Sequence, residues 1–164
     1  MKNILLVCTG NTCRSPMAEA MLDEAVSDSD RLRGAVKTES AGTFAFDGSE
    51  PAKNACTVMY ELGLSIDRHR AQQVTQELVD WGDMVLTMDV YGLEQMQVMF
   101  PEAADKMALL KQFVEEGAVE KADEEYYNID DPYGEDLDTY RACAAEIRSC
   151  IEKLIQRLER APEI

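Results

Sequence analysis

The segment VCTGNTCRS, residues 7–15, places a thiol and a guanidinium in one short turn. Cys8 and Arg14 lie six positions apart in it, directly before a segment with helical pattern. Such a loop can turn its backbone N–H groups toward a tetrahedral oxyanion such as phosphate, because a helix start leaves several donors unpaired. Arg14 can bind two oxygens of that anion with its planar fork. The same positive groups favour the thiolate of Cys8, so we expect a nucleophile beside an anion-binding loop.

The elements on either side are expected to hold the ends of this loop. Residues 4–7 form an apolar run that predicts a buried strand. A helix is expected from Pro16 to about residue 28, with Ser15 as its N-cap. Residues 35–41 alternate like a second strand. A strand, a helix and a strand of these lengths imply a right-handed parallel crossover.

The remaining apolar patterns continue this alternation of strands and helices. We expect an α/β fold: one three-layer domain over residues 1–164, with a four-stranded parallel sheet, helices on both faces and the phosphate-binding loop after the first strand. Ligands of such sheets bind beyond the carboxyl ends of the strands, where this loop lies. The acidic stretch 115–127 is expected to be solvated surface. The patterns predict helices at 51–63, 75–81, 90–99 and about 135–160, and strands at 83–88 and 107–110.

The composition argues against several classes of protein. The 16 basic and 32 acidic residues give a net charge of −16, so we expect neither nucleic acid nor a membrane as partner. No run approaches the roughly 20 apolar residues of a membrane span. Five scattered cysteines do not suggest a disulfide framework, and a single histidine without a Cys-x2-Cys pair suggests no metal and no cofactor. The expected location is the cytoplasm.

A second reactive group is expected near the end of the chain, in the turn DDPYG. Asp131 precedes a proline there, so a stiff backbone presents its carboxyl group, which could protonate a leaving group. Tyr133 could line a pocket beside it. Because Asp-Pro-x-Gly is also a common turn, the residues alone leave a purely structural turn as the alternative.

The stretch CTGNTCRSPMAEA after a first strand resembles the signature loop of the low-molecular-weight protein tyrosine phosphatase family. The alternative is a tight strand–helix turn with a buried cysteine and a solvated arginine. The resemblance implies that Cys8 is the nucleophile and that Asp131 acts as general acid and then as base for water. It also implies that Arg14 binds the phosphoryl oxygens, that Ser15 donates its hydroxyl to Cys8, and that the rest of the phosphate-binding loop consists of Thr9, Gly10, Asn11, Thr12 and Cys13.

The resemblance covers nearly the whole chain. Ser40, in ESAGT, corresponds to a serine that supports the loop through hydrogen bonds, and Phe46 to an aromatic wall of the substrate cleft, which Tyr133 would share. His69, in HRAQQ, corresponds to a histidine that braces the loop asparagine, although a solvated histidine is the alternative. The family commonly has arginine where this chain has Gln72, which departs from the pattern.

The implied activity is hydrolysis of phosphorylated proteins through a cysteinyl-phosphate, without cofactor, with inorganic phosphate as product and inhibitor. Thr12 resembles the bacterial protein arginine phosphatase branch, since many tyrosine-specific members have Ile or Leu there. Phosphoarginine is therefore slightly favoured over phosphotyrosine. The alternative is a protein tyrosine phosphatase proper. Cys13 would be a redox partner, able to form a reversible disulfide with Cys8.

A more distant alternative is a thioredoxin-coupled arsenate reductase, which has a similar loop on the same fold. Those enzymes carry two relay cysteines in a mobile segment in the middle of the chain. Here Cys143 and Cys150 lie seven apart on one face of the last helix, where a small apolar side chain is expected to be buried. A catalytically dead phosphate-binding module would require the loss of Cys8, Arg14 or Asp131, and all three are present.

Overall fold

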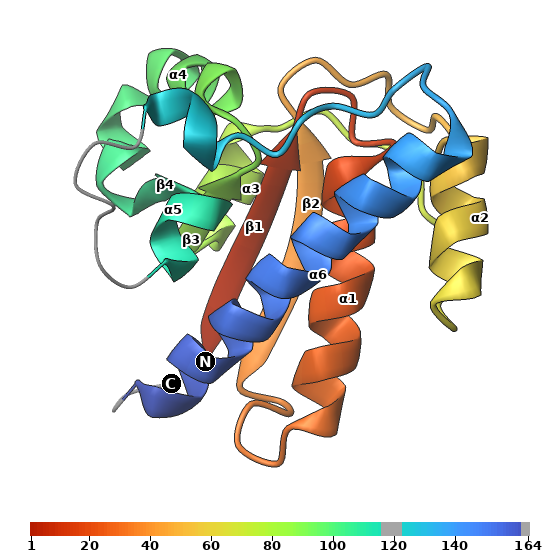
Figure 1. The fold of residues 1–164 in the computed structure, drawn as a ribbon. Helices are drawn as coiled ribbons and strands as arrows, with labels where there is room; N and C mark the ends of the chain where they lie inside the picture. The colour runs from red at the N-terminus through yellow and green to blue at the C-terminus, as the bar shows by residue number, and fades with distance from the viewer. Residues whose placement is uncertain (116–122, 162–164) are drawn as a thin grey trace.

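The computed structural model describes residues 1–115 and 123–161 and confirms the predicted α/β fold. The sheet is parallel, in the order β2-β1-β3-β4 (Figure 1). Its strands are β1 (Lys2–Cys8), β2 (Val36–Gly42), β3 (Met84–Thr87) and β4 (Met107–Leu109). The helices are α1 (Arg14–Asp28), α2 (Lys53–Glu61), α3 (Gln76–Trp81), α4 (Val90–Met99), α5 (Leu110–Val114) and α6 (Leu137–Arg160), with 3-10 turns η1 (Pro101–Lys106) and η2 (Glu124–Tyr127).

The side chains on the two faces of β1 pack into two separate hydrophobic cores. Ile4 and Leu6 pack with α1, α2, α5 and α6, whereas Leu5 and Val7 pack with α3 and α4. This division follows from the two-residue period of a strand, which sends successive side chains to opposite faces. In Figure 1, α1 and α6 lie side by side across one face of β1 and β2. Their packing fixes the start of α1 against the carboxyl end of β1.

Several expected details differ in the structure, besides shifts of one residue at the ends of strands and helices. Helix α1 begins at Arg14 with Cys13 as its N-cap, so the prediction of Ser15 as N-cap is wrong. The Ser15 hydroxyl instead has partners from outside the first turn of the helix, at Cys8 and Asn11. Helix α2 is shorter than 51–63, and α6 begins after Asp136, whose carboxylate caps it. In the stretch 115–127, Tyr127 is buried, and residues 116–122 lie outside the described part.

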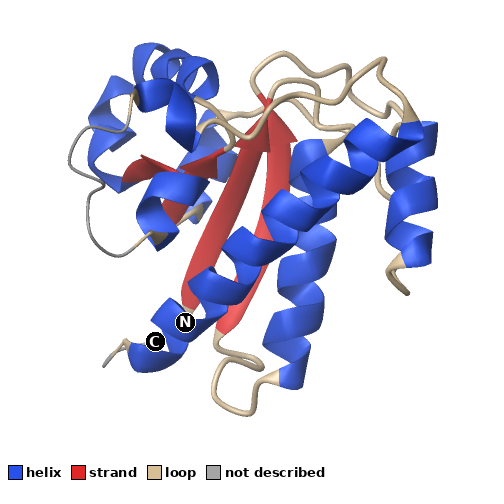
Figure 2. Ribbon diagram, in the orientation of Figure 1, coloured by secondary structure: helices blue, strands red, loops and turns tan. Residues whose placement is uncertain are grey.

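The loops that follow the strands gather at one edge of the sheet (Figure 2). The loop after β2 is tied to the loop after β1, because Thr43 N donates to Cys8 O and Phe44 N to Thr9 O, both at 2.9 Å. Gly42 permits this approach, since a Cβ there would lie 2.4 Å from Thr9 O. Across the 123–161 and 1–115 segments, no helix is long and apolar enough to cross a membrane.

Candidate active site

Asn11 is the residue that shapes the loop between β1 and α1. Its φ of 55° places a non-glycine residue in the left-handed region, which is costly unless other contacts hold it. The side chain is fully buried, and its Oδ1 accepts from the backbone N–H of Gln72 at 2.9 Å. Its Nδ2 donates to Ser15 Oγ at 2.8 Å and to Ser40 Oγ at 3.0 Å. These three bonds join the loop to α1, to β2 and to the segment before α3.

Gln72, where the family commonly has arginine, also contacts the loop. The contact to Asn11 comes from the backbone of Gln72, so it does not depend on the side chain. The Gln72 side chain donates instead to the carbonyl of Ser40 at 2.8 Å. This departure from the family pattern therefore leaves the loop anchored.

Cys8 lies at the carboxyl end of β1 and faces the first turn of α1. Its Sγ is 2.9 Å from Ser15 Oγ, and the side chain is buried. A serine hydroxyl at this distance can donate its proton to a thiolate, which stabilises the charged form of the sulfur. The geometry therefore suits a sulfur that carries negative charge, both before attack and when it leaves.

Arg14 is fully buried and held from two sides. Its Nη1 donates to Asp89 Oδ2 at 2.5 Å and to the carbonyl of Ile129 at 2.9 Å, and its Nη2 lies 3.5 Å from Asp131 Oδ2. Burial by itself would lower the pKa of Arg14, but the charges of Cys8, Asp89 and Asp131 raise it above its ordinary value. Its Nε is buried and makes no hydrogen bond to the described residues. This guanidinium is a fixed cation that can bind an oxyanion.

Asp89 is a further residue of the candidate site, and the sequence pattern did not single it out. It follows β3 and also caps α4, since its Oδ1 accepts from Gly92 N at 2.7 Å. One signal was available, because an aspartate directly after a buried strand lies at the carboxyl edge of the sheet. Its pairing with Arg14 depends on β3 lying beside β1, which the sequence pattern does not specify.

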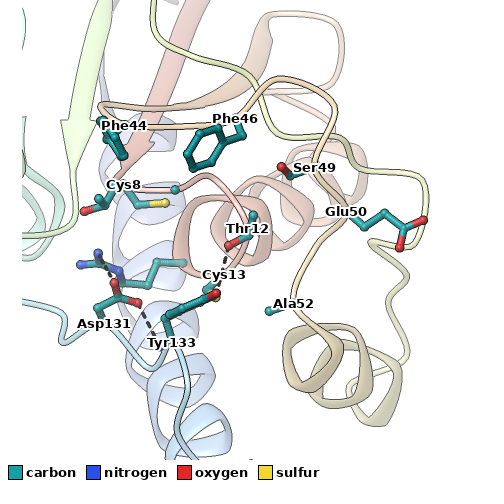
Figure 3. Close-up of a pocket in the computed structure, with 13 residues that line it drawn as sticks. Cys8, Thr12, Cys13, Phe44, Phe46, Ser49, Glu50, Ala52, Asp131 and Tyr133 are labelled. Atoms are coloured by element: carbon teal, nitrogen blue, oxygen red, sulfur yellow. Dashed lines mark hydrogen bonds and ion pairs between the residues drawn. The ribbon is translucent and has the colours of Figure 1, made fainter.

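A pocket of about 510 Å³ opens over the loop. Cys8, Thr12 and Arg14 belong to its lining, together with Thr9, Gly10 and Cys13 from the same loop. Figure 3 shows Phe44 and Phe46 on one side of the pocket and Asp131 and Tyr133 on the other. The rings of Phe44 and Phe46 meet edge to face, with centroids 5.7 Å apart. The expected cleft residues Phe46 and Tyr133 therefore lie around the thiol, and Phe44 joins them.

Asp131 lies in the turn before α6 with its side chain about half exposed. Its Oδ1 accepts from Tyr133 N at 3.1 Å, which orients the carboxylate, and its Oδ2 faces Arg14. A carboxyl group in this place borders both the pocket and solvent. It can give a proton to a group bound at the loop or take one from water.

His69 and Glu19 line a surface hollow distinct from the pocket over the loop. His69 Nε2 is 2.8 Å from the carbonyl of Asn11, so the histidine contacts the loop and is not a solvated side chain. Burial lowers the pKa of His69, and Nε2 must carry a proton and donate it, because a carbonyl oxygen can only accept. The carboxylate of Glu19 accepts from the Ser40 hydroxyl. Burial raises the pKa of Glu19 to about 7.

The other cysteines lie within the core or at its edge. Cys13 is buried, with its Sγ 3.3 Å from the Tyr140 hydroxyl, and burial raises the pKa of its thiol. Cys143 and Cys150 are buried on α6, where burial raises their pKa values to about 12 and about 11. All five cysteines are free thiols. Within residues 1–115 and 123–161, no cluster of three or more His, Cys, Asp or Glu residues could hold a metal ion.

Comparisons with known proteins agree with this geometry. The family model described as low molecular weight phosphotyrosine protein phosphatase matches residues 3–163. A protein-arginine-phosphatase of Geobacillus stearothermophilus is 40% identical, with 95% of both chains covered. A probable low molecular weight protein-tyrosine-phosphatase, EpsP, of Ralstonia solanacearum is 33% identical, with 96% of this chain and 97% of the relative covered. The solved structure of the YwlE arginine phosphatase from Geobacillus stearothermophilus superposes with a TM-score of 0.82 at 39% identity, over 97% of this chain and 94% of that one.

Proposed function

This chain belongs to the low molecular weight phosphotyrosine protein phosphatase family of cysteine-based hydrolases, and we propose that it hydrolyses phosphoarginine in proteins in preference to phosphotyrosine. The observation that carries the proposal is the arrangement of Cys8 and Arg14 around one loop. The thiol lies at the strand end beside a hydroxyl donor, and the buried guanidinium faces the same pocket. This arrangement combines a sulfur nucleophile with a site for a phosphoryl group.

In the first step, Cys8 Sγ attacks phosphorus in line with the leaving group. A sulfur–phosphorus bond forms while the bond from phosphorus to the substrate nitrogen or oxygen breaks. The loop amides of residues 9–14 and Arg14 bind the three non-bridging oxygens and stabilise their charge. Asp131, in its protonated form, gives its proton to the leaving atom.

In the second step, water attacks the phosphorus of the cysteinyl-phosphate. Asp131, now a carboxylate, takes a proton from that water, and the bond between sulfur and phosphorus breaks. The Ser15 hydroxyl, 2.9 Å from Cys8 Sγ, stabilises the thiolate as it leaves. The products are the free enzyme and inorganic phosphate, which we expect to inhibit by binding the same loop.

Three features support phosphoarginine as the preferred substrate. Thr12 lines the pocket, where its hydroxyl and small volume tolerate a guanidinium that an aliphatic side chain would disfavour. Glu50 and Asp131 add carboxylates to the pocket lining, which suits a cationic side chain. The relative at 40% identity is a protein-arginine-phosphatase.

Phosphotyrosine is the second candidate. Phe44, Phe46 and Tyr133 surround the pocket and can stack on a phenyl ring. A planar guanidinium can stack on the same rings, so the aromatic wall serves both substrates. Relatives named as protein-tyrosine-phosphatases also match along 96% of the chain.

Arsenate reduction receives little support from the geometry. A disulfide relay needs accessible thiolates, whereas Cys143 and Cys150 are buried and their raised pKa values keep them protonated at neutral pH. The free cysteines also suit a reducing compartment, and we place the enzyme in the cytoplasm.

The test is a rate assay on one peptide series that carries phosphoarginine, phosphotyrosine or phosphoserine, with Cys8→Ser and Thr12→Ile in parallel. We expect phosphoarginine to be preferred, Thr12→Ile to shift the preference toward phosphotyrosine, and Cys8→Ser to lose turnover while it still binds phosphate. A preference for phosphotyrosine in both the parent and Thr12→Ile would make Thr12 incidental and identify a tyrosine phosphatase. Full activity of Cys8→Ser would overturn the mechanism.

A further inference from the structure

A chain of four hydrogen bonds runs from Glu19 on α1 to the Cys8 sulfur. The Glu19 carboxylate accepts from Ser40 Oγ, and Ser40 Oγ accepts from Asn11 Nδ2 at 3.0 Å. The second Asn11 Nδ2 proton goes to Ser15 Oγ at 2.8 Å, and Ser15 Oγ lies 2.9 Å from Cys8 Sγ. Every side chain between Glu19 and the sulfur is at least 99% buried, so water does not compete for these bonds.

The direction of each bond follows from one fixed donor. The backbone N–H of Gln72 can only donate, so the atom of Asn11 that it meets is the amide oxygen. The Asn11 nitrogen therefore faces both hydroxyls and gives one proton to each. Because Ser15 Oγ already accepts from Asn11, its own proton is left for Cys8. Ser40 Oγ likewise accepts from Asn11, so its proton goes to Glu19.

We propose that Glu19 is a positioning residue of the phosphatase reaction: by holding the Ser40 proton, its carboxylate orients Asn11 and directs the Ser15 proton onto the Cys8 sulfur. The inference rests on the proposed function, because it concerns the charge on sulfur before attack and on departure. The sulfur loses its negative charge when it attacks phosphorus and regains it when it leaves in the second step. The hydrogen bonds from Glu19 to Cys8 therefore act mainly on kcat. KM depends instead on how Arg14 and the loop amides bind the phosphoryl oxygens.

The surroundings of Glu19 make the charge of its carboxyl group depend on pH near neutrality. Burial and the negative charges of Asp23 on α1 and Glu39 on β2 raise its pKa to about 7, against the opposing bond from Ser40. His69 Nδ1 lies 4.0 Å away, and burial lowers the pKa of its ring. Asp67 and Arg68 border the same surface hollow as Glu19. Protonated Glu19 can itself donate to Ser40 Oγ, and this would reverse the direction of the hydrogen bond between the two residues.

The test compares kcat of the full-length enzyme and of Glu19→Gln from pH 5.5 to 8.5 on one phosphopeptide. We expect Glu19→Gln to lower kcat about 3- to 10-fold at pH 8, the size of one well-placed hydrogen bond, with KM unchanged. The ratio of the two kcat values should fall toward one as the pH drops through 7. The two enzymes differ only at position 19, so the ratio reports what depends on that side chain.

Two further variants separate positioning from general damage. Ser40→Ala interrupts the same series of hydrogen bonds while it keeps the Glu19 carboxylate, so its loss of kcat should match that of Glu19→Gln. The double variant should lose no more kcat than either single variant. Asp23→Asn is the matched control at pH 8: it removes a carboxylate of α1 that bonds to Thr38 and is not part of this series of hydrogen bonds. Loss of the Asp23 charge lowers the pKa of Glu19, so Glu19 is a carboxylate at pH 8 with or without Asp23, and we expect unchanged kcat and KM at that pH.

A ratio that does not change with pH would overturn the role of Glu19, as would an additive loss in the double variant or an effect on KM alone. The failure of the proposed function looks different: the parent enzyme itself would then lack thiol-dependent phosphatase activity.

Discussion

Asp89 Oδ2 lies 2.5 Å from Arg14 Nη1, and this pair links the end of β3 to the first residue of α1. Both side chains are largely buried, with 21% of the Asp89 side chain and 2% of the Arg14 side chain exposed. A charged pair with so little solvent must be well satisfied, and the carbonyl of Ile129 completes it. Asp89 thus fixes the guanidinium in the orientation that faces the pocket.

Replacement of Asp89 with Asn tests this orientation. Asn keeps the helix cap of α4, because its side-chain oxygen can still accept from Gly92, but it loses the charge that holds Arg14. We expect kcat/KM to fall about 10- to 100-fold, as for the loss of one charged hydrogen bond, and phosphate to bind more weakly. Steady-state kinetics and phosphate inhibition measure both effects. Asp136→Asn, at the cap of α6, should leave them unchanged, and equal losses in the two variants would contradict this role.

Replacement of Asp131 with Asn tests the general acid. Asn cannot give or take the proton, so we expect kcat to fall roughly 10²- to 10⁴-fold. The fall should be smaller for a substrate whose leaving group needs no proton, such as a nitrophenyl phosphate. Asp130→Asn is the control, because Asp130 does not precede the proline and its carbonyl, not its carboxylate, contacts Cys143. Near-parental activity of Asp131→Asn would remove Asp131 from the role.

Mild peroxide tests the pairing of Cys8 with Cys13. Peroxide converts the Cys8 thiolate to a sulfenic acid, and attack by the Cys13 sulfur forms a disulfide and releases water. We expect inactivation that dithiothreitol reverses in the parent, and far less recovery in Cys13→Ala, where the sulfenic acid is open to further oxidation. Cys143→Ala, which removes another buried thiol, should recover like the parent. Equal recovery of Cys13→Ala and the parent would rule out the disulfide.

The pH dependence of stability tests the charge on Glu19. Its pKa in the folded protein is raised to about 7 from an ordinary value of 4.5, so the folded state binds more protons between these values. Stability therefore falls as pH rises through this window, and the cost persists above pH 7. We expect Glu19→Gln to be more stable than the parent at pH 8, on the order of 2 kcal/mol, and the difference to shrink toward pH 4.5. Thermal unfolding from pH 4.5 to 8 measures it; a difference that grows in acid would contradict the assignment.

The sequence by itself determined the local chemistry and the order of the elements. Cys8 and Arg14 lie six positions apart in one short loop, so their spacing along the chain already limits how far apart they can lie. The alternation of apolar strands and amphipathic helices likewise predicted a parallel sheet, because the periods of 2 and 3.6 residues are local properties. Helix α4 was predicted with its observed limits, Val90–Met99.

Only the tertiary structure decided which distant groups meet that loop. Asp89 reaches Arg14 because β3 lies beside β1, and Glu19 reaches Ser40 because α1 packs against β2. Strand order and helix packing depend on contacts across the whole core, and no local period encodes them. Ser15 illustrates the difference: its position in the sequence is that of a helix cap, but its hydroxyl bonds to Cys8 and Asn11, which the fold brings within reach.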